Sequence, residues 1–237
     1  MLRLAALMPI ALVACVDNGD EGMYVVNNTA VTTACALSGS PDQAFLGRGM
    51  IHYASPSAYV MTPLIQSRIA SGESDVDEIQ RTIQLRGADV TLTLKAVSVE
   101  RDGQFTVTHP EADLTQFSVL FSGSLPPSGY VNSFVDIIPP ATLRQVAQMS
   151  GANVESEPFN AEVLAQVVIK GDINGDAIES APYFYPVSVC NDCVVANLGA
   201  CPLTVSPRPG NACNPYQDGV VDCCVDASNR LVCPGPM

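Results

Sequence analysis

The sequence predicts an all-β protein, an antiparallel β-sandwich of the immunoglobulin-like type with one short helix and a disulfide-rich C-terminal tail. Three observations predict this class. About nine short apolar runs, several of them alternating with polar residues, lie between residues 45 and 189. Two of the connections between runs carry Asp-Gly or Asn-Gly, the strongest short signals for a tight hairpin. Seven of the nine cysteines lie in residues 190–237.

Composition sets the limits within which this prediction holds. Of the 237 residues, 47% are hydrophobic and 15% are charged, which excludes a wholly disordered chain. The net charge is −13, from 11 Lys and Arg against 24 Asp and Glu. A nucleic-acid-binding protein needs a basic surface, so we expect no nucleic-acid partner.

The first fifteen residues carry a targeting signal. Arg3 precedes an apolar run, Leu4–Val13, that is too short to span a bilayer and fits the hydrophobic region of a signal peptide. The run ends in Leu12-Val13-Ala14-Cys15, which resembles the lipobox of bacterial lipoproteins. The resemblance implies that residues 1–14 are removed. It also implies that Cys15 receives a diacylglyceryl group and that its new amino group is acylated, for example with palmitate. The alternative is an ordinary signal peptide cut before a free Cys15.

The number of cysteines supports lipidation. An odd count in an exported protein leaves one thiol without a partner. If Cys15 carries the lipid, eight cysteines remain for four disulfides. In lipoproteins an Asp directly after the lipidated Cys often signals retention in the inner membrane, and Val16 occupies that position here. We therefore expect an outer-membrane protein, on the periplasmic face or the cell surface, held to the membrane by its N-terminal lipid. The disulfide candidates are Cys35, Cys190, Cys193, Cys201, Cys213, Cys223, Cys224 and Cys233.

The remaining chain divides into three parts. Residues 15–43 are a tether, acidic and Gly-containing at its start, followed by an edge segment. Residues 44–189 are the β-sandwich domain. Residues 190–237 are too few to bury a sizeable core, so disulfides must supply their order. Strands are expected at 45–53, 57–69, 79–86, 90–99, 105–107, 115–121, 130–137, 164–169 and 183–189.

Within the sandwich, local signals place turns, a bulge and a helix. The alternation that starts at Val90 slips by one residue near Ala96, which predicts a β-bulge. Asp102-Gly103 and Asn174-Gly175 predict hairpin turns. A helix is expected between Pro139 and Gly151, with its apolar residues on one face against the end of the sandwich.

In the tail, adjacent cysteines restrict the pairing. Cys223 and Cys224 have Cα atoms about 3.8 Å apart, shorter than disulfide geometry allows, so each must pair elsewhere. Seven tail cysteines cannot all pair with one another, so Cys35 must reach the tail if all of them pair. Sequence alone fixes no connectivity.

Motifs for metal or redox chemistry are weak. Cys190 and Cys193 form a CxxC, for which we favour a structural disulfide over a zinc or redox-active pair. The segment Asp172–Asp176 resembles the start of a calcium loop. Ala177 and Tyr183 stand where that loop needs Gly and Glu, so we favour a hairpin. No cofactor or metal is expected.

Candidate catalytic residues are equally few. His52 and His109 are the only histidines, and we interpret each as a surface or hydrogen-bonded residue. Acidic residues between Ser71 and Glu78 are interpreted as a solvated loop rather than a glycosidase pair. No catalytic residue is therefore predicted.

Several segments together resemble uncharacterised, Cys-rich envelope lipoproteins of the myxobacterial type. They are the lipobox, Ala58–Leu64, Leu85–Leu92 and the stretch from Gly171 to Cys193. The resemblance implies location and architecture rather than mechanism. The expected function is a lipid-anchored envelope protein, non-catalytic, with a structural role or a binding role toward an envelope protein or polysaccharide. The alternatives are an envelope hydrolase with an unrecognised site and a CxxC metal or redox module.

Overall fold

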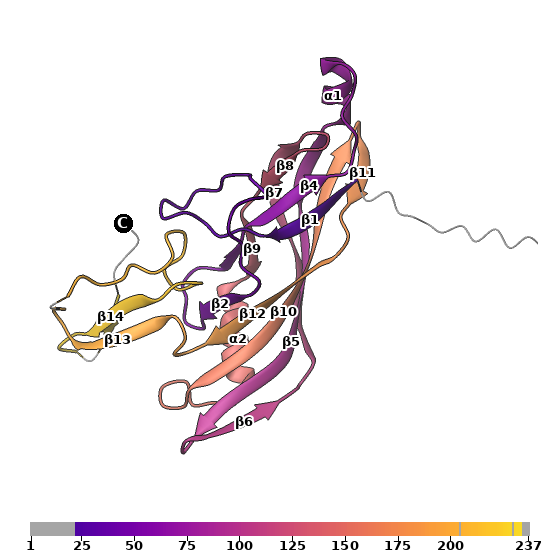
Figure 1. Ribbon diagram of the computed structural model, residues 1–237. Helices are drawn as coiled ribbons and strands as arrows, with labels where there is room; N and C mark the ends of the chain where they lie inside the picture. The colour runs from indigo at the N-terminus through magenta and orange to yellow at the C-terminus, as the bar shows by residue number, and fades with distance from the viewer. Residues whose placement is uncertain (1–21, 204, 229, 234–237) are drawn as a thin grey trace, which may run out of the picture.

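A computed structural model describes residues 22–203, 205–228 and 230–233, and it confirms the all-β class (Figure 1). None of the helices in the described ranges is long and apolar enough to cross a membrane. The elements are β1 (Met23–Asn28), β2 (Gly49–His52), β3 (Tyr59–Met61), β4 (Pro63–Ser67), α1 (Asp75–Arg81), β5 (Ile83–Arg101), β6 (Gln104–Thr108), β7 (Ala112–Leu125), β8 (Tyr130–Asn132), β9 (Val135–Ile138), α2 (Pro140–Met149), β10 (Phe159–Ile173), β11 (Asp176–Glu179), β12 (Tyr183–Cys190), β13 (Val195–Ala200), β14 (Val221–Val225) and β15 (Leu231–Val232).

A seven-stranded sheet forms the main layer, and the antiparallel pair β5 and β10 is its centre. Beyond β5, the edge is formed by β6 and then β7, which pair with successive parts of that long strand. Beyond β10 lie β11 and β12, and β2 follows β12. The predicted antiparallel pairing has two exceptions, because β2 runs parallel to β12 and β13 runs parallel to β14.

The central strands are longer than expected. β5 has 19 residues and joins the runs that were predicted separately as 79–86 and 90–99. Its pairing with β10 shifts by one residue at Arg86 and again at Lys95. Each shift is a bulge that returns the apolar side chains to the inner face, so the strand continues where the alternation breaks. The bulge predicted near Ala96 is thereby confirmed.

Both predicted hairpin turns are confirmed. Asp102 and Gly103 connect β5 to β6, with φ values of 52° and 75°. Asn174 and Gly175 connect β10 to β11, with φ values of 52° and 93°. Positive φ at both central positions is the type I′ turn, whose twist matches that of the flanking strands.

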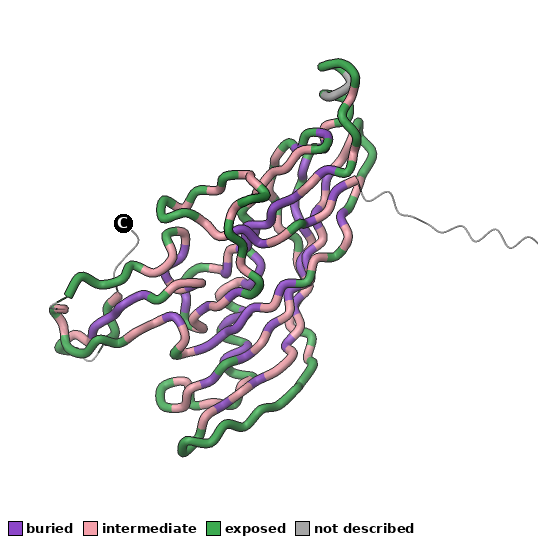
Figure 2. The backbone as a smooth tube through the Cα atoms, in the orientation of Figure 1, coloured by how far each residue is buried: buried purple, intermediate pink, exposed green. Residues whose placement is uncertain are grey.

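One face of the large sheet is covered. Along β10 the odd-numbered residues from Phe159 to Ile169 are buried, and the intervening residues are partly or fully exposed. The covering elements are the β1–β4–β8 sheet, the β3–β9 pair and α2. Figure 2 shows buried residues along the middle of the strands and exposed ones at α1 and the β5–β6 hairpin.

The helix α2 agrees with its prediction. It begins at Pro140, ends before Gly151, and buries Leu143, Val146 and Ala147 in the core. The expectation of one helix is wrong, because α1 forms in the stretch interpreted as a polar loop and an early strand. Its acidic residues come first and Arg81 last, which suits the helix dipole. Seven residues are too few to show a helical period, so the pattern could not reveal it.

Candidate functional site

All eight cysteines of the described residues are paired. The disulfides are Cys35–Cys213, Cys190–Cys193, Cys201–Cys224 and Cys223–Cys233. Cys15, the predicted lipidation site, lies outside the described residues. The first disulfide joins residues separated by 178 positions and ties the segment after β1 to the tail, as the odd number of tail cysteines requires. The adjacent Cys223 and Cys224 have different partners, as predicted.

The tail extends the large sheet at its β2 edge. The backbone N–H of His52 donates to the carbonyl of Tyr216, and that of Asp218 donates to the carbonyl of Met50. A bridge between Ile51 and Gln217 lies between these bonds. Residues 216–218 therefore run along the free edge of the short strand β2.

Side chains from the same segment fix the tail to β3. The Gln217 amide accepts a hydrogen bond from the N–H of Val60 at 2.9 Å and donates to its carbonyl at 3.0 Å. Asn214 donates to the carbonyl of Ala58 at 3.0 Å. Both amides are buried, and no buried side-chain nitrogen or oxygen of the described residues lacks a hydrogen-bond partner. The junction between tail and sandwich is thus a satisfied polar network.

The carboxylate of Asp218 is the centre of this network. Its Oδ1 accepts a hydrogen bond from the N–H of Met50 at 2.8 Å. Its Oδ2 accepts from the hydroxyl of Tyr59 at 2.8 Å and from the amide of Gln217 at 3.3 Å. The Tyr59 hydroxyl is 3.1 Å from that of Tyr185, and both rings are buried. No ion pair among the described residues includes Asp218.

This environment changes the acidity of the group. Burial raises the pKa of Asp218 to about 6, although the hydrogen bonds from Tyr59, Met50 and Gln217 act to lower it. Burial, followed by the negative charge of Asp218, raises the pKa of Tyr59 well above its usual value. Asp218 is therefore charged at neutral pH without a cation beside it and takes up a proton in mildly acidic solution. Chemically, it can accept hydrogen bonds from a ligand, pair with a cation or exchange a proton.

A cleft opens beside this carboxylate. Its volume is about 460 Å³, within the range of small-molecule sites, and it lies between residues 31–35 and residues 209–219. Among the described residues, Asp218 is the only charged one that lines it, and Cys35 of the long-range disulfide is also in its wall. Both residues have left-handed backbones, with φ values of 51° and 52°. Strain of this kind in residues other than glycine often accompanies functional sites, so this cleft is the candidate site.

Neither histidine forms part of the cleft lining. His52 accepts a hydrogen bond at Nδ1 from the N–H of Ala54 at 3.2 Å and donates from Nε2 to the carbonyl of Asn191 at 3.0 Å. Burial lowers its pKa, so the neutral ring is favoured. His109 is an exposed residue between β6 and β7. The interpretation of both as surface or hydrogen-bonded residues agrees with these positions.

The CxxC turn has a structural environment. Cys190 is buried at the end of β12 and is bonded to Cys193. Between them, the side chain of Asn191 accepts a hydrogen bond from the N–H of Phe159 and donates to the carbonyls of Val154 and Glu157. The described part of the chain contains no cluster of three or more potential metal ligands.

The acidic segments considered in the sequence analysis do not line the cleft. Asp172 forms an ion pair with Arg86 beside the β10–β11 hairpin, so the calcium-like segment is used as a turn. Asp75 belongs to α1.

Sequence reasoning missed the residues that matter most at the cleft. Asp218 stands in a Gln-Asp-Gly stretch that has the composition of an ordinary turn. Its partner Tyr59 is 159 positions away. The only available signal was the cysteine count, which implied a disulfide between Cys35 and the tail. That link brings the tail near the start of the body but does not indicate that Tyr59 and Asp218 interact.

Comparisons with known proteins give remote similarities in structure. No family model matches the chain, and no curated protein matches it. A protein from Archaeoglobus fulgidus aligns with 60% of this chain and 91% of its own, with 11% identity and a TM-score of 0.35. The sporulation control protein Spo0M from Bacillus subtilis aligns with 61% of this chain and 50% of its own, with 15% identity and a TM-score of 0.27. AT1g01470 from Arabidopsis thaliana aligns with 67% of this chain and 92% of its own, with 9% identity and a TM-score of 0.29. These similarities carry no argument about function.

Proposed function

We propose that this chain is an exported envelope protein, anchored in the outer membrane by a lipid on Cys15, with a non-catalytic binding role. The observation that carries the proposal is the pairing of eight cysteines in four disulfides, which leaves Cys15 as the ninth. Disulfides in such number persist in oxidising compartments outside the cytoplasm. This agrees with the charged start, apolar run and lipobox of the first fifteen residues.

Lipid attachment would hold the acidic body firmly without any contribution from its charge. Two or three acyl chains anchor a protein far more strongly than one. Removal of residues 1–14 takes away Arg3 and no acidic residue, so the charge changes from −13 to −14. An acidic body is not attracted to anionic lipid surfaces.

Intact mass spectrometry of the protein extracted from its native membrane tests the anchor. We expect the mass of residues 15–237 plus acyl chains, with eight cysteines alkylated only after reduction. The Cys15→Ser variant is the control and should keep its four disulfides without gaining a lipid. An unlipidated wild-type protein would contradict the anchor. Free thiols at Cys190 and Cys193 would make zinc or redox chemistry the leading alternative.

For the binding role, the cleft beside Asp218 is the proposed contact site and an envelope protein or polysaccharide the proposed partner. Ala34 lines the cleft and is exposed, so Ala34→Trp should fill part of it. Purified peptidoglycan sacculi are the first probe. We expect wild-type protein to sediment with sacculi and Ala34→Trp to lose sedimentation, while Phe105→Trp, distant from the cleft, behaves as wild type. If wild type stays in the supernatant, the polysaccharide partner is wrong. If both variants sediment, the cleft is not the contact site.

A further inference from the structure

The helix α1 exposes two apolar side chains at one end of the molecule. Val76 is 63% exposed and Ile79 is 74% exposed. Residues three positions apart lie on the same face of a helix, so the two form one apolar surface. The other described helical side chains, Asp75, Gln80 and Arg81, are exposed as well. The helix thus projects from the sandwich without burying this apolar pair.

The chain enters the structure at the same end. The carbonyl of Gly22 accepts a hydrogen bond from the N–H of Arg68 at 2.9 Å, and α1 starts seven residues after Arg68. Figure 1 shows α1 above the start of β1, the first strand of the described chain. The β5–β6 hairpin lies at the opposite end.

The distance to the proposed lipid is limited by the length of the stalk. Cys15 precedes Gly22 by seven residues, and an extended residue spans at most about 3.5 Å. A lipid on Cys15 would therefore keep Gly22 within about 25 Å of the bilayer surface. Since α1 lies at this end, its exposed pair is within reach of the same surface.

We propose that Val76 and Ile79 of α1 form a second membrane contact beside the lipid anchor, inserting into a zwitterionic phospholipid surface. This inference rests on the proposed lipidation of Cys15. The two side chains alone bind a bilayer weakly, but the anchor keeps them at high effective concentration next to it. The contact would orient the body, with the cleft and the β5–β6 hairpin held away from the lipid.

The charge of this end selects the lipid. The stalk contains Asp17, Asp20 and Glu21, and α1 itself has three acidic residues and one Arg. Anionic headgroups would repel this surface, whereas zwitterionic headgroups permit insertion of the apolar pair.

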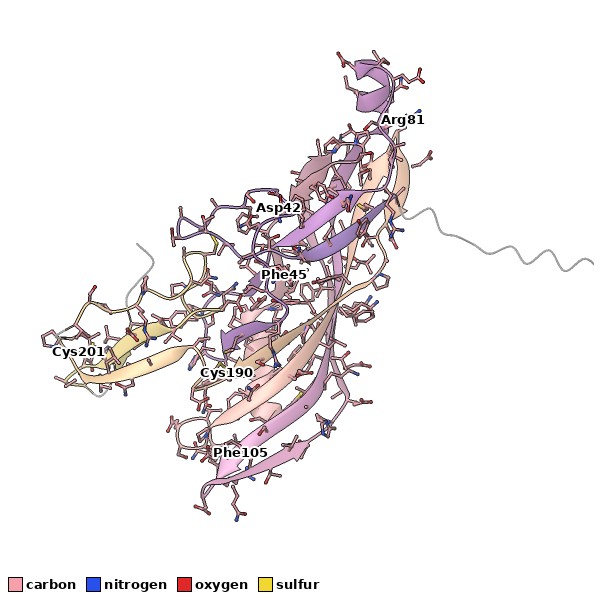
Figure 3. All side chains as sticks on the ribbon, viewed as in Figure 1. Asp42, Phe45, Arg81, Phe105, Cys190 and Cys201 are labelled. Carbon is pink, nitrogen blue, oxygen red and sulfur yellow. A yellow bond between two sulfur atoms is a disulfide. The ribbon has the colours of Figure 1, made fainter. Side chains whose placement is uncertain are left out.

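Tryptophan fluorescence tests the contact directly, because the chain contains no Trp. The reporter is Ile79→Trp in the lipidated full-length product, reconstituted in phosphatidylcholine vesicles with brominated acyl chains. We expect a blue-shifted emission and about a twofold loss of intensity relative to unbrominated vesicles, as for a ring at the acyl boundary. Phe105→Trp is the matched control. Phe105 is 70% exposed and lies on the β5–β6 hairpin, far from Arg81 of α1 (Figure 3). Its emission should be unchanged.

A second substitution tests the role of the pair. Val76→Glu added to Ile79→Trp should abolish the quenching while flotation with the vesicles continues through the lipid. If neither Ile79→Trp nor Phe105→Trp is quenched in protein that floats with the vesicles, the proposed contact is overturned. The lipid anchor would still stand.

A separate experiment distinguishes a missing lipid anchor from a missing α1 contact. If mass spectrometry shows no lipid, Cys15, the one cysteine outside the four described disulfides, can be coupled to a maleimide lipid in the same vesicles. Quenching at position 79 in that arm would support the contact without natural lipidation, and its absence would overturn it.

Discussion

At the scale of single residues, the half-buried carboxylate of Asp218 is the most unusual group in the described chain. Three neutral donors surround it, from Met50, Tyr59 and Gln217, and no cation is paired with it. Removing a charge from water costs more than three hydrogen bonds recover here, so its pKa rises. The same group joins the tail to β2 and borders the cleft. Its protonation therefore changes both the stability of the fold and the charge of the candidate site.

Asp218 should make the folded protein less stable as pH rises through the mildly acidic range. Its pKa is about 6 in the folded state against a reference value of 3.8, so the folded state binds the extra proton between these values. Stability contributed by that proton is fully present below about pH 4 and is lost as pH rises through 6, by about 3 kcal/mol in all and by about 2 kcal/mol between pH 4.5 and pH 7.5. Urea unfolding of wild type and Asp218→Asn at pH 4.5 and pH 7.5 measures the effect. The variant should lack this part of the pH dependence.

The free energies of unfolding of wild type and Asp218→Asn are compared with each other at the same pH, because other acidic groups also make stability depend on pH. Hydrogen bonds from the side chain and backbone of Arg208 lower the pKa of Asp222, and hydrogen bonds from the backbone and side chain of Arg230 lower that of Asp226. The stabilisation from these groups is lost in the opposite direction, as pH falls. These contributions are common to both proteins and cancel in the difference. A difference in stability that does not change with pH would show that Asp218 has no raised pKa.

Gly49 should be required for the position of Tyr59. A Cβ atom at Gly49 would lie 2.4 Å from the Tyr59 hydroxyl oxygen, too close for any real contact. Gly49→Ala should therefore displace the ring and destabilise the protein by about 1–3 kcal/mol. Gly47→Ala is the matched control, since nothing lies within 4 Å of its added atom. Equal unfolding midpoints in urea for the two variants would contradict this packing argument.

At the scale of elements, the two bulges in β5 explain why one strand can run for 19 residues along a curved core. Each inserts one residue and restores the inward direction of the apolar side chains. The alternation of apolar and polar residues indicates the bulge near Ala96, but it does not show whether the strand ends there. The partner strand β10 decides that, because it continues to pair on both sides of the shift.

The helix α2 should contribute to stability through its buried face alone. Leu143 is completely buried and Arg144 is exposed. Leu143→Ala should cost about 2–5 kcal/mol in the free energy of unfolding, through lost burial and the cavity left behind. Arg144→Ala should change it by less than about 0.5 kcal/mol. Urea unfolding followed by circular dichroism measures both, and a large loss in Arg144→Ala would show that the outer face also packs.

At the scale of the whole molecule, a disulfide and a hydrogen-bonded segment together hold the tail to the sandwich. Cys35–Cys213 closes a loop with a sequence separation of 178, and residues 216–218 extend the sheet at β2. A covalent link of this span removes much of the freedom of the unfolded chain.

Removal of the long-range disulfide should loosen the tail before the sheet. The double variant Cys35→Ser with Cys213→Ser should lose about 2–5 kcal/mol of stability. Limited proteolysis should then cut between residues 195 and 233 first, because that part has few buried apolar residues apart from its disulfides. Mass spectrometry of the fragments locates the cut. First cleavage within β5 or β10 would contradict this order of stability.

Features that neighbouring residues determine could be predicted from the sequence, whereas features created by residues far apart in the chain could not. The Asp-Gly and Asn-Gly turns and the Pro and Gly that bound α2 are local signals, and they predicted correctly. The apolar runs placed most strands, but the single strands expected at 57–69 and 130–137 are wrong. Each run divides into two strands, β3 with β4 and β8 with β9, that belong to different sheets. The helix α1 was missed because seven residues carry no period. The environment of Asp218 was missed because it is created by residues such as Tyr59, 159 positions away.

By itself, then, the sequence determined the all-β class, the hairpins, the bulge, the main helix and the need for Cys35 to reach the tail, since neighbouring residues and the cysteine count fix these. Only the tertiary structure decided the disulfide partners, the parallel position of β2 beside β12, and the docking of residues 216–218 on the edge of β2. Only the tertiary structure placed the half-buried Asp218 beside a cleft. Burial and hydrogen bonding between distant segments depend on how the whole chain packs, and no local pattern encodes that packing.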